Sequence, residues 1–149
     1  QLLVFSKAFA MTGWRLGYAC GPCEIMNMIT KIHQYAIMCA STASQFAAIE
    51  ALKSGEEAKD EMVAEYRIRR NLFVKGLNDI GLSCHLPQGA FYAFPKLDAE
   101  TVSAIVANDV IITPGLAFGS LGEGYARMSY AASQENIKEA LKRIQQVVE

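Results

Sequence analysis

The chain has 149 residues, of which 52% are hydrophobic, and its formal net charge is −1. This length suits one domain, or one domain plus part of another, and the hydrophobic fraction is enough to build a core. The near-neutral charge gives no overall attraction to nucleic acid or to an anionic membrane surface, and no apolar run has the length of a membrane span.

Two further features bear on where the protein works. The sequence begins at Gln1, inside a strand-like segment and without the charged and apolar regions of a signal peptide, so we expect a piece of a longer protein. Four cysteines in a chain without secretory features predict reduced thiols and a cytoplasmic location.

The first part of the chain alternates strand and helix signals. Short apolar runs followed by glycine or polar residues favour strands, and apolar residues repeated every three or four positions favour helices. Pro22 fits a first helical position, and Gly55 ends a helix. The predicted elements are a buried parallel strand at 1–5, a loop at 6–12, a strand at 14–20, and helices at 22–38 and 43–54.

The remainder begins with a long predicted helix at 56–80. Tyr66, Phe73 and Leu77 belong to its apolar stripe, and Gly81 follows as a C-cap glycine would. Ser133 is a good N-cap for a terminal helix. The elements predicted between them are strands at 82–86, 90–94, 110–113 and 125–131, with a short helix at 100–108.

One segment carries chemistry, the run from Ser6 to Tyr18. Lys7 follows the first strand, and Arg15 stands eight positions later. A lysine amine with a lowered pKa forms a Schiff base with a carbonyl, and the planar fork of an arginine suits a phosphate. The pair points to a phosphorylated aldehyde cofactor, pyridoxal phosphate, although such a pair is more often two solvated surface charges.

The pattern Ser-Lys-x-Phe-x-x-Thr-Gly-x-Arg-Leu-Gly-Tyr at 6–18 closely resembles the signature of the class I aminotransferases, the fold type I enzymes related to aspartate aminotransferase. Segments resembling this family cover nearly the whole chain, among them Gln45-x-Ala-Ala, Pro87-x-Gly-Ala-Phe-Tyr and Pro114-Gly-x-x-Phe-Gly. The resemblance implies that Lys7 carries the cofactor as an internal aldimine. It also implies that Arg15 grips the cofactor phosphate, with Ser6 as a further contact.

A second arginine, Arg127, stands among strand residues. Arginine on the solvent face of an alternating strand is the ordinary explanation, whereas in a half-buried strand an arginine needs an anionic partner. The residues alone leave both open. The resemblance implies that Arg127 binds the α-carboxylate of the substrate through two parallel hydrogen bonds, a task that suits arginine better than lysine.

The resemblance further implies an α/β fold in two parts. Residues 1–55 would complete the large cofactor-binding domain, and residues 56–149 would form the small C-terminal domain, a short sheet covered by helices. The implied reaction moves an amino group between an L-amino acid and a 2-oxo acid, with Lys7 as general base and then acid at the substrate Cα. The implied assembly is a homodimer, because the family builds its site across two subunits.

Some groups of the family site lie upstream of the lysine and outside this sequence. They include the aspartate at the pyridinium nitrogen, the aromatic residue stacked on the ring, and the phosphate loop. Without the aspartate the electron sink is weakened, so the isolated piece is expected to be inactive. A C–S lyase of the same fold is an alternative, since it would share Lys7, Arg15 and Arg127. Selection of the donor side chain would rest mostly on upstream residues.

The residues alone also allow other classes of function. Cys20-Gly-Pro-Cys23 is a C-x-x-C pair at a helix start, as in a thiol–disulfide oxidoreductase, but Arg-Leu-Gly-Tyr-Ala precedes it where a tryptophan is expected. A zinc site is disfavoured because there is no second close pair. The basic run 67–70 is typical of a solvated helix face rather than of nucleic-acid binding. A non-catalytic binding module is the remaining alternative.

Overall fold

The computed structural model describes residues 2–149, so Gln1 of the first predicted strand lies outside the described residues. The chain divides into two compact units, Gln1–Met62 and Val63–Glu149, called here the first and second unit. The predicted domain boundary between residues 55 and 56 stays a prediction, and the helix that begins there runs past the end of the first unit.

The first unit opens with the segment that carries Lys7. Strand β1 (Leu2–Val4) leads directly into the short helix α1 (Phe5–Ala8), and a 3-10 turn η1 (Thr12–Trp14) precedes strand β2 (Gly17–Ala19). The two strands are antiparallel, with Val4 opposite Gly17. The segment between them is therefore a loop closed at its base by strand pairing.

This arrangement corrects two predictions about the start of the chain. The strand is antiparallel to β2 rather than part of a parallel pair, and the Val4 side chain is 65% exposed rather than buried. An apolar run is typical of buried parallel strands, but its composition does not fix the direction of the partner. Lys7 also lies in a helical turn rather than in an irregular loop, because Phe9 N–H bonds to the Phe5 carbonyl oxygen at 3.2 Å.

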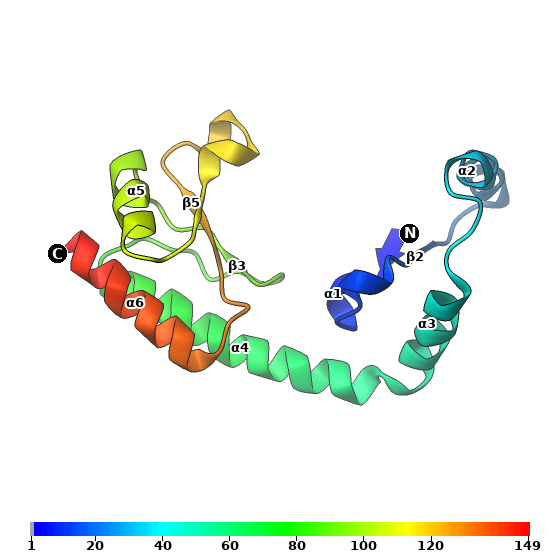
Figure 1. Ribbon diagram of the computed structural model, residues 1–149, viewed down its shortest axis with the longest axis horizontal. Coiled ribbons are helices and arrows are strands. Elements are labelled where there is room, and N and C mark those ends of the chain that lie inside the picture. Colours follow the sequence, from blue (N-terminus) through cyan, green and yellow to red (C-terminus); the bar gives the residue numbers. More distant parts are fainter. Residues whose placement is uncertain (1) are drawn as a thin grey trace. The chain divides into compact units, whose positions relative to one another are not determined.

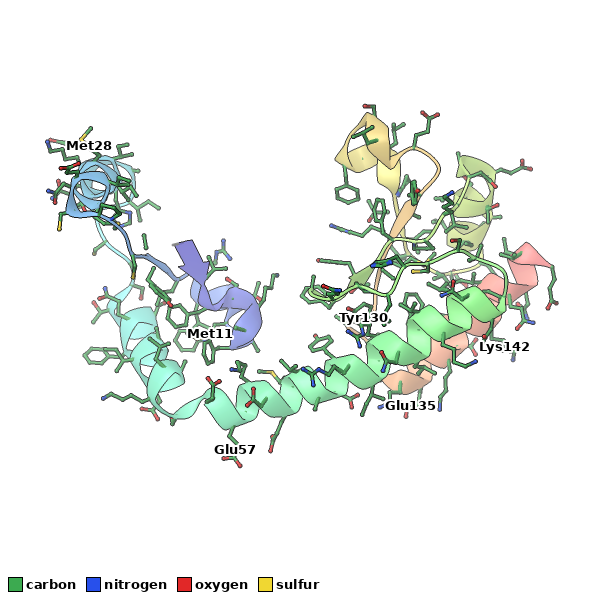
Figure 2. All side chains as sticks on the ribbon, turned by 180° about the vertical axis from the view of Figure 1, so that it is seen from behind. Met11, Met28, Glu57, Tyr130, Glu135 and Lys142 are labelled. Atoms are coloured by element: carbon green, nitrogen blue, oxygen red, sulfur yellow. The ribbon has the colours of Figure 1, made fainter. Side chains whose placement is uncertain are left out.

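Two helices complete the first unit, α2 (Cys23–Ala36) and α3 (Thr42–Ser54). Both confirm predicted helices, with Pro22 as the residue before α2 rather than within it. Among the residues of this unit whose burial is described, the buried apolar ones are Phe5, Met11 and Ala48. They pack α3 against the loop that carries Lys7, and Figure 2 labels Met11 within this group.

The second unit contains the predicted small α/β arrangement. Strands β3 (Tyr92–Ala93), β5 (Ala126–Ser129) and β4 (Thr113–Pro114) form an antiparallel sheet with β5 in the centre. Its helices are the larger part of α4 (Glu56–Asp79), which begins in the first unit, together with α5 (Ala99–Ala107) and α6 (Gln134–Val148). Figure 1 shows α6 lying alongside α4, and both contribute to one core with the sheet and α5. The predicted α/β class is confirmed.

The helix ends of this unit follow their sequence signals. Gly81 has φ +87°, the left-handed conformation expected after a helix. The Ser133 hydroxyl accepts a hydrogen bond from Asn136 N–H at 3.2 Å, which is an N-cap. Among the described residues, no helix combines the length and apolar character needed to cross a membrane.

The strand predicted at 82–86 is wrong. There the backbone of Cys84 bonds to a side chain, since Cys84 N–H donates to Asn78 Oδ1 and the Cys84 carbonyl accepts from Asn78 Nδ2, both at 3.1 Å. An amide side chain thus takes the place of a neighbouring strand. The strand predicted at 110–113 is also shifted, with β4 starting at Thr113 and Ile111 left 93% exposed.

Candidate active site

The loop between β1 and β2 holds three of the predicted site residues. Phe5 is buried, 4% exposed, and fixes the start of α1, while Ser6 is half-buried and Lys7 is exposed. One apolar anchor and the strand pairing at its base therefore hold a turn that presents a lysine amine at the surface.

Arg15 is joined to the Lys7 turn through Thr12. Arg15 Nη1 donates to the Thr12 carbonyl oxygen at 3.0 Å, and the Thr12 hydroxyl donates to the Ser6 carbonyl oxygen at 3.1 Å. Arg15 is exposed and has φ +51° and ψ +48°, a left-handed conformation that residues with a Cβ seldom adopt. Local hydrogen bonds thus link Arg15 through Thr12 to the Ser6 backbone, at the start of the turn that contains Lys7.

Arg127 occupies the centre of the sheet in the second unit. It pairs with Thr113 across β4 and β5 and is half-buried. The carbon of its guanidinium lies 4.5 Å from the centre of the Tyr92 ring and 4.6 Å from that of Phe118. A guanidinium that lies over aromatic rings still has its planar fork of N–H donors, so this setting fits recognition of a carboxylate.

Two side chains hold the turn next to Tyr92. Tyr130 was not singled out by the sequence, whereas Arg70 belongs to the basic run 67–70 and is half-buried rather than on a fully solvated face. The Tyr130 hydroxyl donates to the Ala90 carbonyl oxygen at 3.0 Å, and Arg70 Nη1 donates to the Pro87 carbonyl oxygen at 3.1 Å. Ala90 has φ +60°, so the turn needs such support. Tyr130 is 1% exposed, and burial raises the pKa of its hydroxyl, which therefore stays a hydrogen-bond donor.

A hollow of ≈ 470 Å³ in the first unit does not coincide with the predicted site residues Lys7 and Arg15. It is lined by Phe5, Leu16 and residues of α2 and α3, and neither Lys7 nor Arg15 lines it. Cys20 and Cys23 are exposed cysteines at the junction of β2 and α2. Among the described residues, no group of three or more histidine, cysteine, aspartate or glutamate side chains is arranged to hold a metal ion.

The donors of the Lys7 loop fit a phosphorylated aldehyde. The amine of Lys7 supplies the nucleophile for a carbonyl. Arg15 has a cation and Ser6 a hydroxyl, the two kinds of group that would bind phosphate oxygens. Arg127 belongs to the second unit, where its setting suits a carboxylate.

Comparison with known proteins identifies the group to which this chain is related. The family model for "Aminotransferase class I and II" matches residues 4–144. The chain belongs to this family. The Bacillus subtilis protein YugH, named as an aminotransferase, is 53% identical over 147 residues, and the match covers 94% of this chain and 38% of YugH.

Two further class I and II aminotransferases show how far the likeness extends. Aspartate aminotransferase of Pyrococcus horikoshii is 43% identical, over 97% of this chain and 40% of that protein. The crystal structure of the aromatic aminotransferase from the same organism is 41% identical, with a TM-score of 0.92 over 98% of this chain and 41% of its own. The predicted family and fold are confirmed, and the chain spans about two fifths of the length of these relatives.

The family assignment also ranks the alternatives. The relatives carry the names of aminotransferases, so a C–S lyase of the same fold is not favoured. The family match also favours an aminotransferase over a non-catalytic binding module. Because the match includes the segment of Cys20 and Cys23, it favours an aminotransferase over a thiol–disulfide oxidoreductase as well.

Proposed function

We propose that this chain is the C-terminal part of a pyridoxal-phosphate-dependent aminotransferase, which moves an amino group between an L-amino acid and a 2-oxo acid. The observation that carries the proposal is the loop in which Thr12 joins the Ser6 backbone to the Arg15 guanidinium around Lys7. The donors of this loop match the aldehyde and the phosphate of the cofactor. Family membership supports the same assignment.

Each residue has a defined task in the proposed site. Arg15 and Ser6 bind the cofactor phosphate, and Lys7 holds the cofactor through its amine. When bound, the cofactor supplies an electron sink for the charge that develops at the substrate Cα. Lys7 acts first as a base, which removes the Cα proton, and then as an acid, which delivers that proton to a carbon of the cofactor. Arg127 binds the substrate α-carboxylate and so orients the Cα–H bond.

The proposed substrates share an α-amino acid core rather than one side chain. The similar proteins are named for aspartate in one case and for aromatic amino acids in another. Lys7, Arg15 and Arg127 act on the parts that all of these substrates have. We propose a homodimer, as in the family, and a cytoplasmic location, as expected for a chain with four cysteines and no secretory features.

The test uses the full-length protein and the Lys7→Ala variant. We expect a near-ultraviolet or visible cofactor band that shifts on addition of an amino acid and is altered in Lys7→Ala. We also expect turnover to require a 2-oxo acid, which a C–S lyase would not need. A folded full-length protein without a cofactor band would refute the proposal.

A further inference from the structure

Ser44 is a residue of α3 and lies outside the Lys7 loop. Its side chain is 5% exposed, and its hydroxyl donates to the Trp14 carbonyl oxygen at 2.8 Å. Serine within a helix commonly bonds to the carbonyl four residues earlier, as Ser54 does to Glu50 at 3.1 Å. Ser44 instead reaches a residue thirty positions away, and this contact ties α3 to the loop.

The bond acts on the peptide group that leads into Arg15. The Trp14 carbonyl and the Arg15 nitrogen belong to one planar peptide unit, so a bond that fixes the carbonyl direction also restrains φ at Arg15. That φ is +51°, which a residue with a Cβ disfavours and which the surroundings must therefore hold. Ser44 supplies a restraint where the backbone needs one.

The other restraints on Arg15 lie within its own loop. Trp14 N–H donates to the Met11 carbonyl oxygen at 3.2 Å, and Arg15 Nη1 donates to Thr12. Both partners of each of these bonds belong to the loop itself, so the bonds do not attach the loop to another element. Ser44 belongs to a thirteen-residue helix packed on the loop through Ala48, so its hydroxyl links the turn to a separate element.

We infer that Ser44 is a positioning residue for Arg15, which acts through the Trp14 carbonyl to hold the guanidinium where it grips the cofactor phosphate. The inference rests on the proposed function, because it assumes that Arg15 binds this phosphate. It predicts that loss of the Ser44 hydroxyl weakens binding of the phosphate group and leaves binding of the pyridine ring unchanged.

The experiment compares two ligands that do not form a Schiff base with Lys7. Dissociation constants for pyridoxamine 5′-phosphate and for pyridoxamine are measured by calorimetry on the full-length protein, freed of cofactor, and on its Ser44→Ala variant. We expect about fivefold weaker binding of the phosphorylated ligand, the order of one hydrogen bond, and unchanged binding of pyridoxamine. Ser54→Ala, the same change on the same helix, is expected to alter neither constant.

Two additional variants separate positioning from general damage. In an Arg15→Ala background, Ser44→Ala should cause no further loss for the phosphorylated ligand, because the residue it positions is gone. Ser44→Cys nearly keeps the volume but replaces a strong donor with a weak one, so it should show the same selective loss even if the alanine variant folds poorly.

The outcomes distinguish failure of this inference from failure of the proposed function. Equal weakening of both ligands, or an unchanged preference for the phosphorylated one, would overturn the role of Ser44. An additive loss in the Arg15→Ala background would do the same. If the unmodified protein does not prefer the phosphorylated ligand, the phosphate role of Arg15 fails and the proposed function fails with it.

Discussion

The two units of the chain differ most in how they bury apolar side chains. The second unit has a core to which α4, α5, α6 and the sheet all contribute, with Leu77, Ile105 and Ile144 fully buried. The first unit buries only Phe5, Met11 and Ala48 as apolar residues among those described. The unit with Arg127 therefore rests on its own core, whereas the unit with Lys7 and Arg15 does not.

Two amphipathic helices show this difference in detail. Helix α6 turns Ile137 and Ile144 into the core, while α2 buries none of its described residues and leaves Ile32 and Tyr35 70% and 93% exposed. Hydrogen bonds to Thr12 and Ser44, rather than a large core, hold the Lys7 loop. Local hydrogen bonds can thus define the Lys7 loop even though α2, in the same unit, leaves its apolar face exposed.

The largest effect is expected when the two parts are produced separately. Residues 56–149 should unfold cooperatively on heating, because they include α4 and the whole core of the second unit. Residues 1–55 should show no cooperative transition, because the three apolar residues that are buried among those described cannot offset the entropy of ordering the chain. Circular dichroism and amide proton dispersion are the measurements. A cooperative transition in residues 1–55 would break the comparison.

A matched pair of isoleucines gives the next largest effect. Ile144 of α6 is 0% exposed and Ile32 of α2 is 70% exposed. Ile144→Ala should lower the free energy of unfolding of this chain by about 2–5 kcal/mol, since it leaves a cavity. Ile32→Ala should change it by less than about 0.5 kcal/mol. Urea unfolding of both variants measures the difference.

The same pair sharpens the comparison in the full-length protein. If the rest of that protein covers α2, Ile32→Ala should there cost far more than in this chain, while Ile144→Ala should cost the same in both. Equal costs for Ile32→Ala in the two settings would mean that α2 stays uncovered.

The sequence predicted the parts of this structure that depend on neighbouring residues. The helices, the Ser133 cap and the left-handed Gly81 follow from local spacing and residue type. The loop of Lys7 and Arg15 was found because nine of its thirteen residues match a family signature. Their roles in catalysis and binding stay predictions.

What the sequence did not predict depends on contacts between distant residues. Asn78 takes the backbone bonds of Cys84, and so removes a strand that apolar composition favoured. Ser44 and Tyr130 reach carbonyls thirty and forty positions away. A serine or tyrosine in an apolar pattern carries no sign of such a partner, although a polar residue on a buried helix face is a reason to look for one.

Arg127→Lys tests whether the second unit supplies the carboxylate site. Lysine keeps the charge but loses the fork and the contact with the Tyr92 and Phe118 rings. In the full-length protein we expect KM for both the amino acid and the 2-oxo acid to rise roughly ten- to hundredfold, the value of a charge-assisted hydrogen bond. Arg67→Lys, at an exposed position of α4, is the control. Unchanged KM values would exclude Arg127 from the site.

The smallest effect concerns a polar link within the second unit. Glu65 of α4 accepts from Arg69 at 2.7 Å and from Gln134 of α6 at 3.2 Å. The hydrogen bond from Arg69, followed by that from Gln134, holds the pKa of the Glu65 carboxyl below its ordinary value. The folded state therefore favours the ionised carboxylate. Its contribution to stability is present above the pKa of the unfolded chain and is lost as the pH falls through the lower folded value.

Glu65→Gln should accordingly lower the urea midpoint slightly at neutral pH, by less than Ile144→Ala does, and the deficit should shrink as the solution is acidified below the ordinary pKa of glutamate. Glu57→Gln, at an exposed position of the same helix, is the control. Figure 2 labels Glu57 on α4 and Glu135 at the start of α6. A deficit for Glu65→Gln that equals that of Ile144→Ala would mean that polar contacts between α4 and α6, and not the shared core, hold the second unit together.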